Sequence, residues 1–215
     1  GHKYIPELYE RGVRNFVVDH IPATMQNVDD SNFLIVPDVK KALQTIASYH
    51  RGRFTAPVIG ITGSRGKTIV KEWLYQLLCA DYSMVRSPRS YNSQIGVPLS
   101  IWEMNENTQL AIFEAGISQP NEMVSLQSMI RPKLSIITNI GDEHEEGFAS
   151  QRLKCEEKVM LCRDCDCIVY NGDDVLISDV VANAGLTVKE IAWSRRNPDS
   201  PLFVSSIKKS KHTTT

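Results

Sequence analysis

The stretch Val58–Thr68, VIGITGSRGKT, decides the fold, because an apolar strand runs through a glycine loop into an amphipathic helical pattern. Gly63 and Gly66 leave room for backbone N–H groups to converge on phosphate oxygens, and the helix N-terminus adds its positive dipole end. Lys67 would neutralise the β- and γ-phosphates of a nucleotide, and the Thr68 hydroxyl would bind Mg²⁺. A standard phosphate loop has a glycine five positions before Gly66, whereas here Gly63 supplies the nearer glycine. The alternative is a plain turn between strand and helix with an exposed lysine.

Further along, apolar runs alternate with helical patterns, which predicts an α/β fold with a mainly parallel sheet flanked by helices. The expected strands cover residues 58–61, 110–114, 134–139, 168–171 and 188–193, and the expected helices cover 67–79, 121–129, 151–163 and 175–182. Polar turns follow two of these strands, at Asn139–Gly141 and Asn171–Asp173. Ligands of open α/β sheets bind at this carboxyl edge of the strands.

The first 55 residues differ from the rest and predict part of a small α/β domain. Helical patterns cover residues 4–10 and 39–49, and short apolar strands cover 15–18 and 33–36. The segment Arg51–Pro57 reads as the junction. We therefore expect two domains, at residues 1–55 and 56–215, of which the first is the later part of something larger.

Composition excludes several classes of protein. The chain of 215 residues has 24 Lys and Arg against 25 Asp and Glu, and its basic residues concentrate only at Lys208–Lys211. This balance argues against a nucleic-acid binder that relies on phosphate neutralisation. No apolar run approaches the roughly 20 residues of a membrane span, and the N-terminus lacks a signal-peptide core. The expected location is the cytoplasm, with no membrane partner.

Four of the five cysteines fall within thirteen residues, at Cys155, Cys162, Cys165 and Cys167. The spacing has some similarity to a thiolate zinc or redox site. The alternative is that Cys155 and Cys162 belong to a helix and Cys167 opens an apolar strand, where buried free cysteines are ordinary.

Four motifs resemble, in order, those of the Mur ligase family. The segment Thr62–Thr68 resembles its TGxxGKT loop, Tyr91–Pro98 its asparagine segment, and Ala111–Gly116 its strand ending in a metal-binding glutamate. The segment Thr138–Phe148 resembles the histidine motif of one branch, and residues 5–36 give weaker support. The resemblance covers about residues 1–193.

This resemblance implies an ATP-dependent, ADP-forming amide ligase of peptidoglycan precursor synthesis, and hence of cell-wall biogenesis. The branch suggested by the histidine motif joins D-alanyl-D-alanine to a UDP-N-acetylmuramoyl-tripeptide through an acyl phosphate. Residues 1–55 would be part of the domain for the UDP-sugar substrate, and residues 56–215 would be an ATP-binding domain incomplete at its C-terminal end. A C-terminal domain of the same enzyme would be missing, which would leave this chain inactive alone. The alternatives are another Mur-type ligase, a folylpolyglutamate-type ligase, or a nucleotide-binding module without ligase activity.

The resemblance also assigns roles to residues. ATP would lie against the loop residues Gly63, Ser64, Arg65, Gly66, Lys67 and Thr68. Thr68 and Glu114 would bind one Mg²⁺, whereas His144 and a carbamylated Lys158 would bind a second. Asn92 would lie near the γ-phosphate and the reacting carboxylate, so Lys67, Asn92, His144 and Lys158 form the expected catalytic set.

Several of these residues also have an interpretation without a functional role. Taken alone, Glu114 fits a strand-end salt bridge, His144 fits a solvated loop among acidic neighbours, and Lys158 fits an exposed helix lysine. Lys154 lies four residues before Lys158 on the same expected helical face and competes for its role. Arg65 either contacts phosphate or points to solvent.

Overall fold

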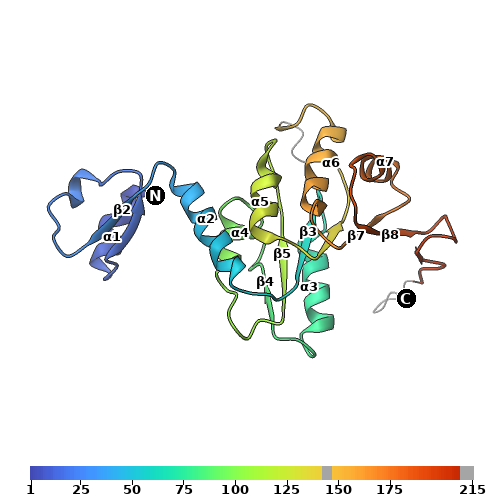
Figure 1. Cartoon of the computed structure of the whole chain (residues 1–215), viewed down its shortest axis with the longest axis horizontal. Helices are drawn as coiled ribbons and strands as arrows, with labels where there is room; N and C mark the ends of the chain where they lie inside the picture. Colours follow the sequence, from blue (N-terminus) through green and yellow to red (C-terminus); the bar gives the residue numbers. More distant parts are fainter. Residues whose placement is uncertain (142–146, 209–215) are drawn as a thin grey trace. The chain divides into compact units, whose positions relative to one another are not determined.

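The computed structural model describes residues 1–141 and 147–208, and its larger part is a parallel seven-stranded sheet (Figure 1). In spatial order the strands are β4 (Met84–Arg86), β5 (Leu110–Glu114), β3 (Val58–Thr62), β6 (Leu134–Ile137), β7 (Cys167–Asn171), β8 (Lys189–Ser194) and β9 (Leu202–Phe203). Every neighbouring pair is parallel. The expected α/β class with a mainly parallel sheet is confirmed.

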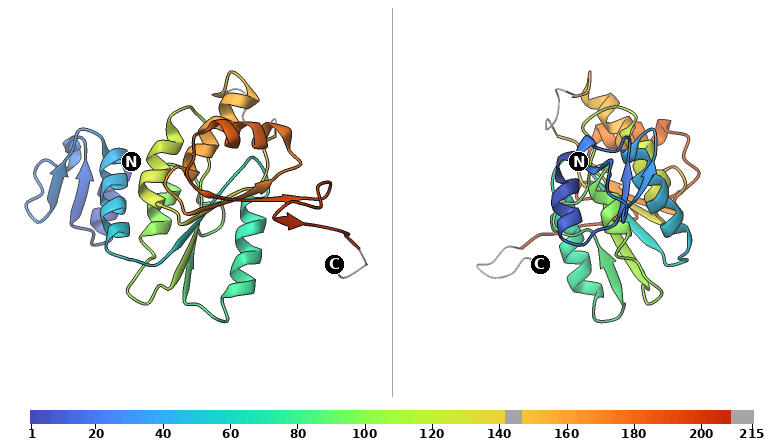
Figure 2. Two further views of the ribbon diagram at one scale, coloured as in Figure 1. Left: turned by 45° about the vertical axis from the view of Figure 1, so that its right-hand side comes forward. Right: turned by 90° about the vertical axis from the view of Figure 1, so that its left-hand side faces the viewer.

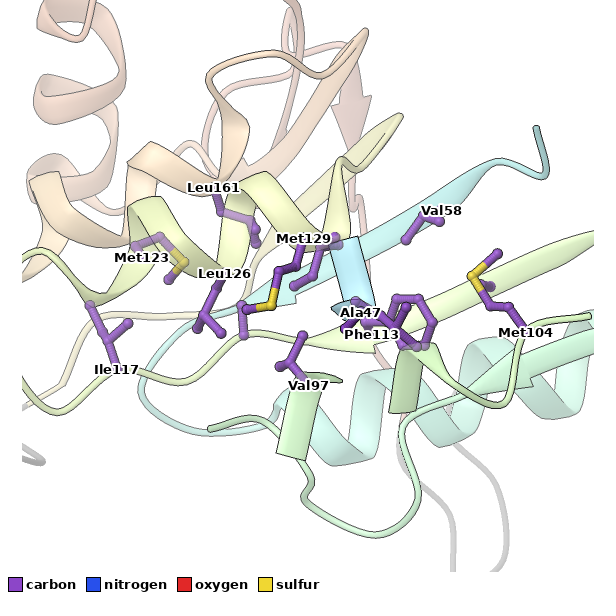
Figure 3. Packing of buried hydrophobic residues seen from close by; sticks show 14 of the residues in the cluster. Ala47, Val58, Val97, Met104, Phe113, Ile117, Met123, Leu126, Met129 and Leu161 are labelled. Atoms are coloured by element: carbon purple, nitrogen blue, oxygen red, sulfur yellow. The ribbon is translucent and has the colours of Figure 1, made fainter. Parts of the chain in front are cut away.

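Helices cover both faces of the central strands. The helices are α3 (Lys67–Leu78), α4 (Gly96–Ile101), α5 (Glu122–Ile130), α6 (Gln151–Val159) and α7 (Val175–Asn183). One face of β3 and β5 packs against α3, whose Val70 and Leu74 contact Ile59 and Ile61. The opposite face packs against α4 and α5 (Figures 2 and 3). Because both faces are covered, β3 and β5 are buried along their whole length.

The main core lies on the α5 side of the sheet. Figure 3 shows Phe113 of β5 and Val58 of β3 among side chains from α4, α5 and the turn after α6, which include Val97, Leu126 and Leu161. A second cluster packs β7 against α6 and α7. The core therefore fixes the ends of β3 and β5, where the glycine loop and Glu114 lie.

Several boundaries differ from those expected from the sequence. The strand expected over residues 134–139 ends at Ile137, and the helix expected over 151–163 ends at Val159, followed by the 3-10 turn η4 (Met160–Cys162). Strands β4 and β9 were not expected, because runs of three and two residues are too short to show alternation. Helix α4 was also missed, since it begins with Gly96 and contains Pro98, which are poor helix formers.

The N-terminal unit covers residues 1–46 and has a small core of its own. It consists of η1 (His2–Tyr4), α1 (Ile5–Glu10), β1 (Asn15–Val18), η2 (Ala23–Met25), β2 (Asn32–Ile35) and the start of α2 (Val39–Gly52). Strands β1 and β2 are parallel, and Phe16, Val18, Ile5 and Met25 are buried together.

The second unit covers residues 47–215, so the division falls inside α2 and not at the expected junction after residue 55. The reason is the packing of the end of α2 within the second unit. Ala47 is fully buried in the main core, and the Arg51 guanidinium donates to the carbonyls of Ile130 and Phe54 at 3.2 and 2.7 Å. Burial lowers the pKa of Arg51.

In the described residues, no helix has both the length and the apolar character needed to cross a bilayer.

The cysteines behave as core residues in the described part of the chain. Cys155, Cys162 and Cys165 are buried, and no three of the thiols lie within ligand distance of one another among the residues that the structure describes. Burial raises the pKa of the Cys155 thiol to about 12. A hydrogen bond between Cys162 and Cys165 raises the pKa of Cys162 and lowers that of Cys165 to about 7. The described residues thus favour the interpretation as buried free cysteines over a zinc site.

Candidate functional site

The carboxyl ends of β5, β3 and β6 lie side by side, with β3 in the middle. The chain leaves β3 through α3 toward one side of the sheet, and β6 joins β3 from the other side. A reversal of this kind in an open parallel sheet opens a crevice above the strand ends, where α/β proteins bind ligands. The loop after β3, the end of β5 and the turn after β6 therefore define the candidate site.

The glycine loop is shaped by close contact with the turn after β6. Gly63 has φ of +136°, and a Cβ there would lie 1.9 Å from Thr138 Oγ1. The backbone N–H of Ser64 donates to the Asn139 carbonyl at 2.8 Å, and that of Arg65 donates to Asn139 Oδ1 at 3.0 Å. Gly66, with φ of +82°, is the N-cap of α3. The expected turn after β6 thus holds the loop in place.

Three lysines surround this loop. Lys67 Nζ donates to the carbonyls of Gly63 and Ser64 at 2.7 and 3.0 Å. Lys158 Nζ donates to the same Gly63 carbonyl at 3.2 Å, and Lys154 Nζ donates to the Gly141 carbonyl at 2.5 Å. Lys154 and Lys158 are buried, so the interpretation of Lys158 as an exposed helix lysine is wrong. Two of these lysines are therefore buried with their ammonium groups against carbonyls of the glycine loop and of the turn after β6.

The first turn of α3 contacts the end of β5 through the hydroxyl of Thr68 and the carboxylate of Glu114. Thr68 Oγ1 donates to Glu114 Oε2 at 3.1 Å, and Asn92 Nδ2 lies 3.5 Å from the same oxygen. Ser90 Oγ lies 3.3 Å from Thr68 Oγ1. A Cβ at Gly116 would lie 2.7 Å from Asn92 Oδ1, so glycine is needed for this approach.

This group of side chains fits a magnesium ion. Hydroxyl and carboxylate oxygens from Thr68, Ser90 and Glu114 are the hard ligands that Mg²⁺ prefers. Glu114 is fully buried, and its Oε1 receives no hydrogen bond of regular geometry among the described residues, although Lys71 Nζ lies 3.0 Å away. The Glu114 carboxylate thus makes a salt bridge through Oε1 and also presents Oε2 to the first turn of α3.

Lys71 and Ser90 are two residues of this site that sequence reasoning missed. Lys71 is three residues after Thr68, which places both on one face of α3, and this spacing was the available signal. Ser90 belongs to an irregular segment, so no periodicity marked it. Arg65 is exposed, and His144 lies outside the described residues.

One further cluster of metal-binding side chains lies in the N-terminal unit, at His2, Asp19 and His20. The two imidazole rings stack with centroids 4.2 Å apart and an interplanar angle of 5°. Because nitrogen lone pairs lie in the ring planes, parallel stacked rings do not direct them at one ion. This arrangement therefore does not fit a metal site.

Comparison with known proteins finds similarity to the Mur ligase family. The family model "Mur ligase middle domain" matches residues 61–215. The chain is 30% identical over 183 residues to the UDP-N-acetylmuramoyl-tripeptide–D-alanyl-D-alanine ligase of Bacillus subtilis (strain 168), a match that covers 83% of this chain and 39% of that protein. The chain thus spans about two fifths of the length of this relative.

Solved structures show the same fold. The MurF ligase from Thermotoga maritima in complex with ADP superposes with a TM-score of 0.84 at 24% identity, over 99% of this chain and 48% of that one. A MurF structure from Acinetobacter baumannii gives a TM-score of 0.85 at 22% identity, over 96% of this chain and 45% of that one. With the family match over residues 61–215, these likenesses lead to one conclusion: the chain belongs to the Mur ligase family and carries its middle domain.

Proposed function

We propose that this chain is the nucleotide- and metal-binding part of an ATP-dependent, ADP-forming ligase that joins D-alanyl-D-alanine to a UDP-N-acetylmuramoyl-tripeptide. The observation that carries the proposal is the meeting of three features at one sheet edge. These are a glycine loop at a helix N-terminus, three lysines around that loop, and a buried carboxylate bonded to the first threonine of the helix. Family membership and the relative from Bacillus subtilis support the choice of reaction.

The physical task of such a ligase is to bring a carboxylate and a triphosphate together, although both are anions. Loop N–H groups and the N-terminus of α3 would bind phosphate oxygens, and Lys67 would exchange its loop carbonyls for them. Lys67 already lies at the loop, bonded to the carbonyls of Gly63 and Ser64. Cations gathered there would lower the electrostatic cost of the approach.

Thr68 and Glu114 would hold a Mg²⁺ ion, which neutralises negative charge on the phosphates when bound. Asn92, whose amide lies 3.5 Å from Glu114 Oε2, would orient the γ-phosphate or the reacting carboxylate, whose activation gives an acyl phosphate. The neutral amine of Lys158 would react with CO₂ and release a proton, and the resulting carbamate would bind a second Mg²⁺ together with His144. The burial of Lys158 beside the Gly63 carbonyl supports a role within the site.

The remainder of the ligase reaction would involve the N-terminal unit of this chain and a part of the enzyme outside it. The N-terminal unit would contribute to binding of the UDP-sugar substrate, and a further domain of the same enzyme would bring the amine. The match covers 39% of the relative from Bacillus subtilis, so that protein is long enough to contain a further domain. The acceptor dipeptide rests on the resemblance alone.

Calorimetric titration of this chain with a non-hydrolysable ATP analogue, with and without Mg²⁺, tests the proposal. We expect binding that Mg²⁺ strengthens and that Lys67→Ala weakens at least tenfold, because the loop loses the cation nearest to the N-terminus of α3. Lys133→Ala is the matched control. Lys133 directly precedes β6, so it lies at the amino ends of the strands, away from the glycine loop, and it pairs there with Asp166. Equal binding by all three proteins would contradict the assignment of the loop.

Ligation assays on the whole enzyme separate the remaining functions. Formation of ADP that depends on both D-alanyl-D-alanine and the UDP-N-acetylmuramoyl-tripeptide supports the proposal. Turnover with a folate and glutamate would instead indicate a folylpolyglutamate-type ligase. Nucleotide binding without turnover on either pair would indicate a binding module. His144→Ala is expected to abolish ligation, and unchanged activity would remove His144 from the metal site.

A further inference from the structure

Lys71 is a fully buried cation at the centre of the site. The proposed reaction gives this lysine no role. Its side chain is 0% exposed, and so is that of Glu114, 3.0 Å away. Lys67 and Lys158 both donate to the Gly63 carbonyl, whereas the hydrogen bonds of Lys71 go to the segment after β4. A buried charge of this kind is costly, so its contacts indicate what it stabilises.

The ammonium of Lys71 joins three elements. It donates to the Ser87 carbonyl at 2.7 Å and to the Arg89 carbonyl, both in the segment after β4. It also lies 3.2 Å from Glu72 Oε1 on its own helix. Because its protons point to these groups, Glu114 Oε1 is held by charge and not by an aligned hydrogen bond.

The two oxygens of the Glu114 carboxylate therefore have different surroundings. Oε1 faces Lys71, whereas Oε2 faces Thr68 Oγ1 at 3.1 Å and Asn92 Nδ2 at 3.5 Å. Attraction to Lys71 fixes the rotation of the carboxylate about its last bond. The oxygen left for a metal ion is then the one that faces the first turn of α3.

Lys71 also holds the segment that carries Ser90 and Asn92. This segment contains Arg89 in a left-handed conformation, with φ of +48°, which costs free energy for a residue with a side chain. Two carbonyls bonded to one ammonium, together with the bond from the Glu114 N–H to Ser87 Oγ at 3.2 Å, offset that cost. Ser90 and Asn92 thereby stay within reach of Thr68 and Glu114.

We propose that Lys71 is a positioning residue for the magnesium site, which orients Glu114 and fixes the segment 87–92 without touching the nucleotide. This inference rests on the proposed function, because it assumes that Glu114 binds Mg²⁺. It predicts that loss of Lys71 changes how the protein responds to Mg²⁺ more than how it binds the nucleotide itself.

The test is to titrate Lys71→Met with the ATP analogue over a series of Mg²⁺ concentrations. We expect the half-saturating Mg²⁺ concentration to rise at least tenfold, while analogue affinity without metal stays within twofold of wild type. The direction of this change separates a positioning role from simple charge repulsion. Removal of a nearby cation alone would strengthen the binding of Mg²⁺, whereas loss of positioning would weaken it. Stronger or unchanged response to Mg²⁺ would overturn the inference. A wild-type protein without any Mg²⁺-dependent binding would instead overturn the proposed function.

Arg86→Met is the matched control. Arg86 shares the Glu72 carboxylate with Lys71, at 3.2 Å, whereas the ion pair with Glu114 belongs to Lys71. Its loss tests whether the surrounding ion pairs matter in general. We expect its half-saturating Mg²⁺ concentration to stay within twofold of wild type, and a shift as large as that of Lys71→Met would overturn the inference.

A comparison of two further variants keeps the test decisive if Lys71→Met does not fold. Glu114→Gln and the double variant Lys71→Met/Glu114→Gln both lack the charged carboxylate, so neither leaves it unpaired. If Lys71 acts through Glu114, the two variants respond equally to Mg²⁺, within twofold. A further loss of tenfold in the double variant would show that Lys71 acts on the metal site through a route other than the Glu114 carboxylate, and it would overturn the inference that Lys71 orients Glu114.

Amide hydrogen exchange gives a readout that needs no nucleotide. Peptides covering residues 86–93 should exchange at least tenfold faster in the double variant than in Glu114→Gln, because two carbonyl contacts are lost. Equal exchange in this segment would show that Lys71 does not hold it.

Discussion

Gly63 shows how the absence of a side chain shapes the glycine loop. Its φ of +136° is rarely adopted by residues with a Cβ, and the added atom would lie 1.9 Å from Thr138 Oγ1 and 3.0 Å from the Asn139 carbonyl. Both contacts belong to the turn after β6 that holds Ser64 and Arg65. The loop and the turn therefore need glycine here to meet at all.

We expect Gly63→Ala to destabilise the chain by about 3 kcal/mol, from backbone strain and overpacking together. Gly185→Ala is the control, since Gly185 has φ of +62° and a Cβ added there would have no described atom within 4 Å. It should cost only about 1 kcal/mol, which is the strain of the backbone conformation. Chemical denaturation of the two variants measures both values. Equal losses would show that contact with Thr138 does not matter.

At this scale the sequence predicted the loop better than its surroundings. Gly63, Lys67 and Thr68 follow one another in a motif, so their proximity needs no knowledge of the fold. Lys71 and Glu114 are 43 positions apart in sequence, and only the pairing of β3 with β5 brings α3 against the end of β5. Single candidate residues of the site could be predicted from the sequence, but the buried ion pair between Lys71 and Glu114 could not.

Helix α6 carries two different surfaces on adjacent faces. Lys154 and Lys158 are one turn apart and reach the glycine loop and the turn after β6. Cys155 and Val159 are also one turn apart and pack into the cluster between β7 and α7. The periodicity of the sequence predicted the helix, whereas the burial of both lysines depends on carbonyl partners in the glycine loop and in the turn after β6.

Cys155 tests the interpretation of the cysteines as core residues. We expect Cys155→Ser to destabilise the chain by about 2 kcal/mol, because a hydroxyl replaces a thiol in an apolar cluster. Cys79→Ser should cost less than about 0.5 kcal/mol, since Cys79 is exposed. Thermal unfolding measures the difference.

Alkylation of the native chain at pH 8, followed by mass spectrometry, gives an independent check. A pKa of about 12 keeps the Cys155 thiol protonated at this pH, and burial shields it from the reagent. Cys79 should therefore react well before Cys155. Rapid modification of Cys155, or a drop in melting temperature on addition of a chelator, would contradict the assignment.

The elements that escaped prediction share a physical cause. Strand β4 has three half-buried residues, and α4 contains Gly96 and Pro98 yet is buried at most of its positions. Tertiary packing, not local propensity, therefore decides these elements. Strands β3 and β5 were predictable because burial on both faces demands continuous apolar runs.

The two units of the molecule differ in how much core each one has. Residues 47–215 bury several clusters of side chains around a seven-stranded sheet, whereas residues 1–46 bury four hydrophobic residues around two strands of four residues. A unit of this size buries a small fraction of its surface and is marginal alone. The sequence predicted a small leading unit, and the structure divides its two compact units inside α2, between Ile46 and Ala47, where the sequence has no glycine, proline or change of composition.

Native-state hydrogen exchange on the intact chain tests this difference. Amides of β1 and β2 should open with a free energy at least about 2 kcal/mol below that of β3 and β5, because fewer buried contacts oppose local opening. Addition of the ATP analogue with Mg²⁺ should raise protection around the glycine loop and at the ends of β3 and β5, since a ligand stabilises the state that binds it. Equal opening free energies in both sets of strands would show that the chain unfolds as one cooperative unit, and the small core of residues 1–46 would then draw its stability from the rest of the protein.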